Sequence, residues 1–145
     1  MTDQEPWTGR FPVEGLDLAN NEDQVLAKLG LIPPDQVRRA RVRGIVDSRA
    51  TRLVIPATLA QQLGLKILGT ANVRYANEQT AERGIARGVH LTYGGRDSVF
   101  NAIVEPDWQS ILVGAIVLED LDFLVDCTGQ RLVPRDPKQI VSEAE

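Results

Sequence analysis

Hydrophobic and polar positions alternate along most of this chain, which predicts short strands joined by turns. Strands are expected around residues 11–18 and 37–46 and at 53–55, 73–76, 80–85, 89–93, 98–104, 111–113, 123–125 and 131–133. Short helices are expected after Pro56 and over residues 116–121. The pattern therefore predicts a mostly β, barrel-like domain with one or two short helices.

The strand pattern divides the chain into three parts. Residues 1–36 are predicted to form an N-terminal extension with a short strand and a short helix, which Asn20 or Asn21 caps and Gly30 ends. Residues 37–134 carry the barrel pattern, and residues 135–145 are predicted to be a polar tail.

Composition and charge narrow the function only slightly. The 145 residues suffice for one domain with a sizeable core, and 43% hydrophobic and 25% charged residues are ordinary values. A net charge of −4 argues weakly against general nucleic-acid binding. Since the chain has one His and one Cys, we expect no metal site and no disulfide within the chain. No cofactor is expected either.

The N-terminus lacks a basic segment followed by an apolar one, so no secretion signal is expected. No apolar run approaches the ~20 residues that are needed to span a bilayer. A cytoplasmic protein without a membrane contact is therefore expected.

Candidate chemistry is concentrated in one turn between two apolar runs. The first run ends at Val46, the turn brings a carboxylate and a hydroxyl, and the second run begins at Leu53. The segment Asp47-Ser48-Arg49-Ala50 resembles the Asp-Thr/Ser-Gly-Ala signature of retropepsin-like aspartic proteases, with Arg49 in place of the glycine. The resemblance extends over about residues 37–134, through Leu59 to Leu65 and through Val113-Gly114-Ala115.

This resemblance implies a retropepsin-like acid-protease barrel that works as a homodimer, because the chain has only one such Asp turn. Each chain would supply Asp47 to a dyad that shares one proton and hydrolyses a peptide bond with an activated water molecule. Ser48 would hydrogen-bond across the dimer, and Ala50 and Thr51 match the residues that follow in the signature. Gly114 would be the structural glycine of the motif.

The resemblance also implies a hairpin that closes over an extended peptide or protein substrate. Its residues here would be the four at the expected turn: Tyr75, Ala76, Asn77 and Glu78.

Arg49 leaves two functions open. A guanidinium beside the dyad would favour the ionised form of both carboxyl groups, so that no general acid remains. The chain would then be a non-catalytic peptide-binding or interaction homodimer on the same fold. If Arg49 instead points outward and pairs with an acid such as Glu105 or Asp107, an aspartic endopeptidase remains the expectation.

A second resemblance covers a shorter segment. Arg52-Leu53-Val54-Ile55-Pro56 and the leucines after it are similar to the swapped-hairpin DNA-binding domain of AbrB and antitoxin-type regulators. Six arginines between residues 38 and 52 favour this DNA-binding alternative. Against it, Thr51 stands where those domains have glycine, and a domain of that size would leave residues 89–133 unexplained.

Overall fold

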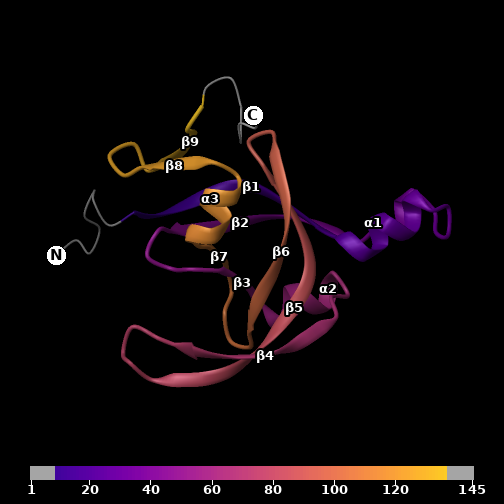
Figure 1. The fold of residues 1–145 in the computed structure, drawn as a ribbon, viewed down its shortest axis with the longest axis horizontal. Coiled ribbons are helices and arrows are strands. Elements are labelled where there is room, and N and C mark those ends of the chain that lie inside the picture. Colours follow the sequence, from indigo (N-terminus) through magenta and orange to yellow (C-terminus); the bar gives the residue numbers. More distant parts are fainter. Residues whose placement is uncertain (1–8, 137–145) are drawn as a thin grey trace, which may run out of the picture.

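The computed structural model describes residues 9–136, which fold into a twisted β-barrel with three short helices (Figure 1). The elements, in chain order, are β1 (Arg10–Asn20), α1 (Asn21–Lys28), a 3-10 turn (Pro34–Gln36), β2 (Arg39–Asp47), β3 (Leu53–Pro56), α2 (Ala57–Gln62), β4 (Ile67–Arg74), β5 (Thr80–Tyr93), β6 (Arg96–Glu105), β7 (Ile111–Val113), α3 (Ala115–Asp120), β8 (Phe123–Asp126) and β9 (Arg131–Pro134). The predicted mostly β barrel with few short helices is confirmed.

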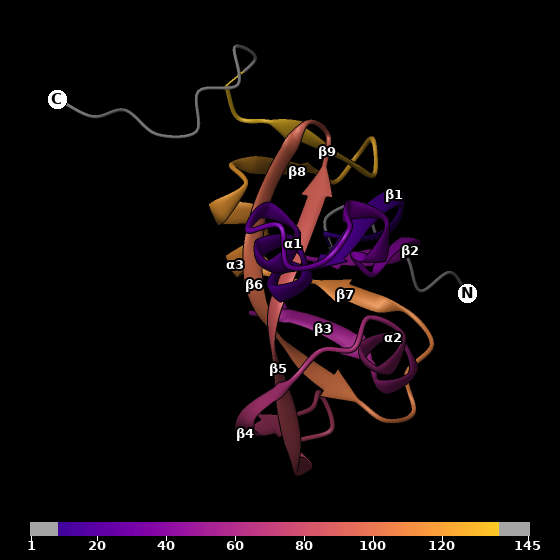
Figure 2. The same cartoon turned by 90° about the vertical axis from the view of Figure 1, so that its right-hand side faces the viewer.

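Six strands close the barrel in the order β1, β2, β7, β3, β6 and β5, and β1 pairs again with β5. β4 extends the sheet beyond β5, and β8 and β9 form a separate two-stranded sheet. In both ribbon views the β8–β9 sheet lies at one end of the molecule and the β4–β5 hairpin at the other (Figures 1 and 2). The hairpin is thus an arm of the sheet at the end opposite β8 and β9.

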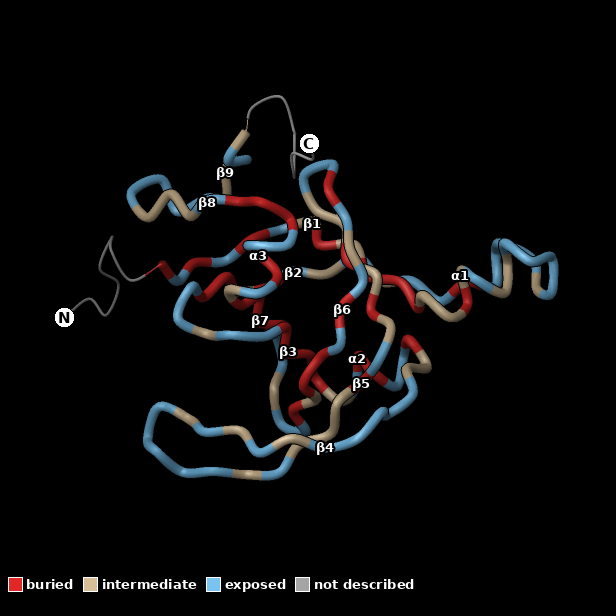
Figure 3. Tube along the Cα trace, viewed as in Figure 1, coloured by how far each residue is buried: buried red, intermediate tan, exposed pale blue. Residues whose placement is uncertain are grey.

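One main apolar core fills the barrel. Its largest fully buried side chains come from strands far apart in the sequence and from the two helices that follow β3 and β7: Phe11, Leu16, Leu18, Leu53, Ile55, Leu63, Leu91, Ile111 and Val117. The buried stretches follow the barrel strands in Figure 3, whereas the β4–β5 hairpin is exposed or half-buried along its length. The hairpin therefore owes little of its position to the main core.

The strand predicted in the N-terminal extension is an integral part of the barrel. β1 pairs antiparallel with β2 over Arg10 to Ala19, and Asp17 to Asn20 pair with β5. β1 joins the barrel because apolar and polar residues alternate along it, so that one face of the strand packs against the core. The part of the extension before residue 9 and the part of the predicted tail from residue 137 onward lie outside the described residues.

Two strands that the sequence suggested separately, at 80–85 and 89–93, form one 14-residue strand, β5. Gly88, with φ +73°, lies between Ala86 and Val89, where the register with β6 shifts. A glycine takes this conformation without the steric cost of a Cβ, so the chain bends there and pairing continues. The turn that follows is shorter than predicted, because Arg96 already begins β6 and donates to the carbonyl oxygens of Leu121 and Asp122.

The swapped-hairpin fold of the DNA-binding alternative is not formed. The segment that suggested it is β3, which lies inside the sheet, parallel to β6 and antiparallel to β7. Within residues 9–136 no helix is long and apolar enough to cross a membrane.

Helix α1 is capped as its sequence predicts and is also tethered by an ion pair that the sequence did not reveal. The Asn20 side chain accepts a hydrogen bond from the Asp23 N–H at 3.0 Å, and Gly30 follows the helix at φ +75°. The buried carboxylate of Asp23 accepts three hydrogen bonds from Arg38, from its backbone N–H and from two guanidinium nitrogens, at 2.9 to 3.0 Å. Asp23 therefore joins α1 to the segment that leads into β2.

The guanidinium of Arg38, opposed in part by burial, lowers the pKa of Asp23 below its usual range. The stability that this contact contributes is therefore present above the ordinary Asp pKa of about 3.9 and is lost as the pH falls through the lower folded value. Asp23→Asn should cost about 2 kcal/mol at neutral pH, and the difference from the wild type should vanish in acid. Urea unfolding against pH checks this, with the exposed Asp35→Asn as a control; a difference that grows in acid would contradict it.

Candidate active site

The loop that carries Asp47 connects two strands that are not neighbours. β7 runs between them, parallel to β2 with Val46 opposite Val113, and antiparallel to β3 with Val54 opposite Leu112. The loop therefore crosses the end of β7 instead of closing a hairpin. In Figure 1 it projects to the same side of the barrel as the tip of the β4–β5 hairpin.

Gly114, directly after β7, allows the loop to approach closely. A Cβ at this position would lie 2.5 Å from the carbonyl oxygen of Arg52 and 2.8 Å from the carbonyl carbon of Thr51. The first two N–H groups of α3 donate to the carbonyl oxygens of Ala50 and Thr51, at 2.7 and 2.9 Å. Because these helix N–H groups have no partner within the helix, the loop supplies their acceptors and is held by α3.

The Asp47 carboxylate is fixed by its own turn and by β1. Its side chain is only 12% exposed. Oδ1 accepts a hydrogen bond from the backbone N–H of Arg49 at 3.0 Å, and Oδ2 accepts one from Nη1 of Arg10 at 2.8 Å. The Asp47 carbonyl oxygen also accepts from the N–H of Ala50 at 3.0 Å. An Asp that bonds to the backbone two residues on is typical of a tight turn and has a defined direction.

The cation at the Asp47 carboxylate is Arg10, which sequence reasoning missed. Arg10 opposes Asp47 in the β1–β2 pairing, and its side chain is 52% exposed. The exposed Arg49, which the sequence made the candidate, reaches the carboxylate only through its backbone N–H. Its side chain forms no ion pair with Glu105 or Asp107. Only the register of β1 on β2 reveals Arg10, and that register is not readable from local sequence.

Ser48 lies against the first described residue of the chain. Its N–H donates to the carbonyl oxygen of Gly9 at 3.1 Å, and a Cβ on Gly9 would lie 2.2 Å from the Ser48 Oγ. Within residues 9–136 the exposed Ser48 hydroxyl has no hydrogen-bond partner.

Tyr75 fastens the β4–β5 hairpin to the end of β6. Its hydroxyl donates to Oε2 of Glu105 at 2.6 Å and accepts from Nε of Arg83 at 2.9 Å. Arg83 also pairs with Oε1 of Glu105, whose side chain is 3% exposed. Burial, together with the hydrogen bond to Glu105, raises the pKa of Tyr75. The Tyr75 side chain therefore anchors the β4 side of the hairpin turn to the end of β6.

The tip of the hairpin is exposed and closed by its own hydrogen bonds. The N–H of Glu78 donates to the Tyr75 carbonyl oxygen at 2.9 Å, and Glu78 has φ +65°. The Asn77 side chain accepts from the N–H of Gln79 at 3.0 Å. Ala76 is also exposed. Within the described part of the chain, these tip residues form no hydrogen bond or ion pair with the Asp47 loop.

A second, smaller apolar cluster lies between the hairpin and the Asp47 loop. Its buried members are Val54, Ile103 and Leu112, and partly buried apolar side chains pack against them: Ile45, Ala50, Ala71, Val73, Ile85 and Trp108. These residues come from β2, from the Asp47 loop, from both arms of the hairpin and from the segment after β6. The loop and the hairpin thus border a common apolar surface.

Within residues 9–136, no group of three or more His, Cys, Asp or Glu side chains is arranged so that it could hold a metal ion. The Asp47 loop, residues 47–52, contains one carboxylate and one pair of hydroxyl residues, Ser48 and Thr51. A single copy of the loop can therefore supply one acid–base group.

The comparisons with known proteins concern structure alone. No protein-family model matches the sequence, and no match was found among proteins of curated function. Similar solved structures include EIAV protease in complex with an inhibitor (18% identity, TM-score 0.49, covering 64% of this chain and 82% of that one). A second is a retropepsin-like aspartic protease from Rickettsia conorii (15% identity, TM-score 0.45, covering 81% of this chain and 84% of that one). A third is the retroviral protease-like domain of Ddi1 from Leishmania major (13% identity, TM-score 0.48, covering 85% of this chain and 88% of that one).

Proposed function

We propose that this chain is a retropepsin-like aspartic peptidase that acts as a homodimer, with one Asp47 from each chain in the catalytic dyad. The observation that carries the proposal is the fixed carboxylate of Asp47, 12% exposed, at the end of a central strand. Its turn is held by hydrogen bonds to β1 and α3. Proton transfer requires a group in a defined position, which this loop supplies.

The second carboxylate would come from a second copy, because each loop offers only one. Two carboxyl groups in contact share one proton, since both cannot ionise easily. The ionised Asp47 would take a proton from water as the water oxygen attacks the peptide carbonyl carbon. The protonated Asp47 would give its proton to the carbonyl oxygen. The C–N bond then breaks when the nitrogen receives a proton, and no cofactor takes part.

An extended peptide is the ligand that the surroundings support. The apolar cluster around Val54, Ile103 and Leu112 would contact its side chains, and the exposed hairpin tip could hydrogen-bond its backbone. The exposed Ser48 hydroxyl would hydrogen-bond with the other copy of the loop.

A non-catalytic peptide-binding homodimer is the second candidate, and the Arg10–Asp47 ion pair favours it. Nη1 of Arg10 lies 2.8 Å from Oδ2 and takes a hydrogen-bonding position that the carboxyl group of a second copy would need for the dyad. If Arg10 stays in place in the dimer, the two carboxyl groups cannot share a proton there and only binding remains.

The experiment that separates these functions measures cleavage of a fluorogenic peptide library at mildly acidic pH against protein concentration. Dimerisation is followed in parallel by sedimentation. For the peptidase, we expect activity per chain to rise with the dimer fraction and pepstatin to abolish it. A dimer that binds the peptides without cleaving them would establish the second candidate. Cleavage by a monomer would exclude the shared dyad.

A further inference from the structure

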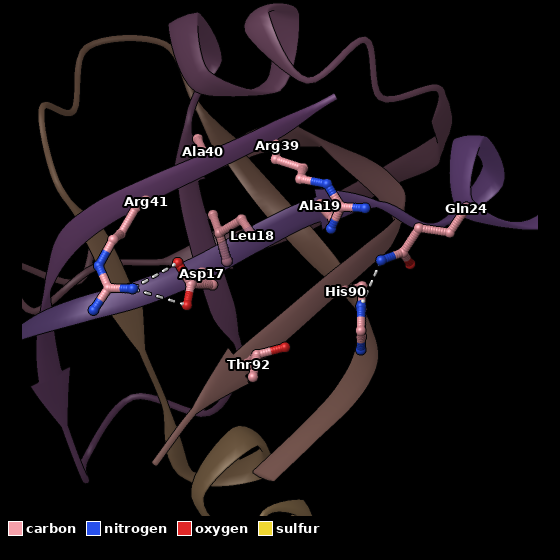
Figure 4. A pocket seen from close by; sticks show the side chains of 9 residues that line it. All are labelled: Asp17, Leu18, Ala19, Gln24, Arg39, Ala40, Arg41, His90 and Thr92. Carbon is pink, nitrogen blue, oxygen red and sulfur yellow. Dashed lines mark hydrogen bonds and ion pairs between the residues drawn. The ribbon is translucent and has the colours of Figure 1, made fainter. Parts of the chain in front are cut away.

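A pocket of about 430 Å³ opens on the outer face of the barrel, where β2, β1 and β5 lie side by side (Figure 4). It is lined by Asp17, Leu18, Ala19, Gln24, Arg39, Ala40, Arg41, His90 and Thr92. Asp47 lies eight positions after Arg39 along β2, which corresponds to about 26 Å along a strand. The pocket is therefore distinct from the Asp47 loop.

Strand register explains the hollow. Arg39 is opposite Ala19 in the β1–β2 pairing, and Ala19 is opposite His90 in the β1–β5 pairing. Paired residues of neighbouring strands project from the same face, so these three side chains form a row across three strands. Because the middle position is only a methyl group, space remains between the guanidinium and the imidazole.

A second row lies beside the first. Asp17 is opposite Arg41 on one side and Thr92 on the other. Since residues two apart on a strand share a face, Arg39 and Arg41 both project over the pocket, as Figure 4 shows. The intervening Leu18 and Ala40 point into the main core.

The charges of this pocket are not balanced by the protein. Arg39 is exposed and has no hydrogen bond or ion pair within residues 9–136. Arg41 contacts Asp17 at 3.3 and 3.4 Å, which is long for a pair of ions, where about 2.7 to 2.9 Å is usual. The Thr92 hydroxyl has no partner in the described part of the chain. Two guanidinium groups thus line the pocket with one carboxylate, which is held loosely by Arg41 alone.

The His90 wall of the pocket is fixed. The ring Nε2 lies 2.7 Å from Oδ2 of Asp97, and Nδ1 lies 2.9 Å from the side-chain nitrogen of Gln24. A carboxylate accepts only, so a neutral ring carries its proton on Nε2 and accepts the Gln24 amide at Nδ1. Gln24 belongs to α1, so the helix and β5 together hold this side in place.

We propose that this pocket binds the phosphate group of a small phosphate monoester at the guanidinium group of Arg39, over Ala19, with the Arg41 guanidinium at the other end of the pocket adding positive charge. The planar fork of an arginine matches phosphate oxygens in pairs, and the Thr92 hydroxyl supplies a third donor. The volume exceeds that of a phosphate ion and lies within the range of about 300 to 1,000 Å³ that holds small molecules. The remaining space receives the organic part of the ester.

The proposal is tested by titrating the full chain with AMP, with glycerol phosphate and with inorganic phosphate, and following the backbone N–H of Thr92 and the arginine Nε–H signals by NMR. We expect saturable shifts, tighter binding of at least one monoester than of inorganic phosphate, and no effect of adenosine. Arg39→Gln should weaken binding about tenfold.

Arg43→Gln is the matched control, because Arg43 lies on the same face of β2 but pairs with Glu14 and does not line this pocket. It removes the same charge and should change the affinity less than twofold. An equal loss of affinity in Arg39→Gln and Arg43→Gln would mean that the phosphate is attracted only by the general positive charge of this face, and would overturn the proposal. Failure of all three phosphates to saturate, or equal affinity for inorganic phosphate and both esters, would also overturn it. Thermal unfolding of both variants confirms that they fold.

Discussion

Asp47→Asn and Arg10→Gln, the two partners of one ion pair, are expected to change peptidase activity in opposite directions. The asparagine can neither take nor give the proton, so cleavage should fall by on the order of a thousandfold. Removing the Arg10 guanidinium frees the hydrogen-bonding position at Oδ2, where the carboxyl group of the second copy can then bond. Activity should therefore rise about tenfold, which corresponds to about 1.4 kcal/mol.

The measurement is the pH profile of kcat/KM for wild type and both variants at a concentration where all are dimers. Asp107→Asn, an exposed acid of another loop, controls for the loss of a carboxylate. Arg49→Gly controls for the loss of an arginine. A gain in Arg49→Gly and none in Arg10→Gln would mean that Arg49, as the sequence suggested, is the cation that governs the site. Unchanged cleavage in Asp47→Asn would refute the peptidase mechanism.

Gly114→Ala is expected to cause the largest loss of stability of any single methyl group added near the site. The new Cβ would lie 2.5 to 2.8 Å from backbone atoms of Thr51 and Arg52, and backbone cannot rotate away as a side chain can. The loop or β7 must then shift, which should cost about 2 to 3 kcal/mol. The two hydrogen bonds from α3 to the loop would lengthen as well, so activity should fall with stability.

Urea unfolding measures this loss, with Gly69→Ala as the matched control. A Cβ at Gly69, on the exposed strand β4, meets nothing within 4 Å, so its stability should change by less than about 0.5 kcal/mol. Equal stability of the two variants would show that the loop adapts without cost and that Gly114 is not needed for its position.

Local signals account for the elements that the sequence predicted well. The two ends of α1 lie at Asn20 and just before Gly30, as predicted, because helix capping depends only on the residues at and next to each end. The fully apolar run Leu53–Pro56 is buried in the sheet, as continuous apolar runs are. Pro56 was predicted to be the first residue of the next helix, but it is the N-cap of α2, which begins one residue later at Ala57. Boundaries of this kind shift easily, because the ends of a helix have few contacts.

Long-range pairing accounts for what the sequence did not reveal. The interruption at Gly88 looked like a strand end, but pairing with β1 and β6 carries β5 through it. The arginine in contact with Asp47 was identified only by the register of two strands separated by α1 and the 3-10 turn. The phosphate pocket likewise depends on three strands that meet only in the barrel.

The pairing of β1 with β5 also bears on how the chain reaches this structure. Asn20 and Val89 are neighbours in the closed barrel, so the first strand has no complete set of partners until most of the chain is available. Contacts between segments so distant in sequence require closure of a long loop before they stabilise anything, and proteins rich in them fold in milliseconds to seconds. During that interval the apolar face of β1 is uncovered. The end of β1, from Asp17 to Asn20, therefore gains its second partner only when β5 is available, whereas Arg10 at the start of the strand pairs with β2 alone.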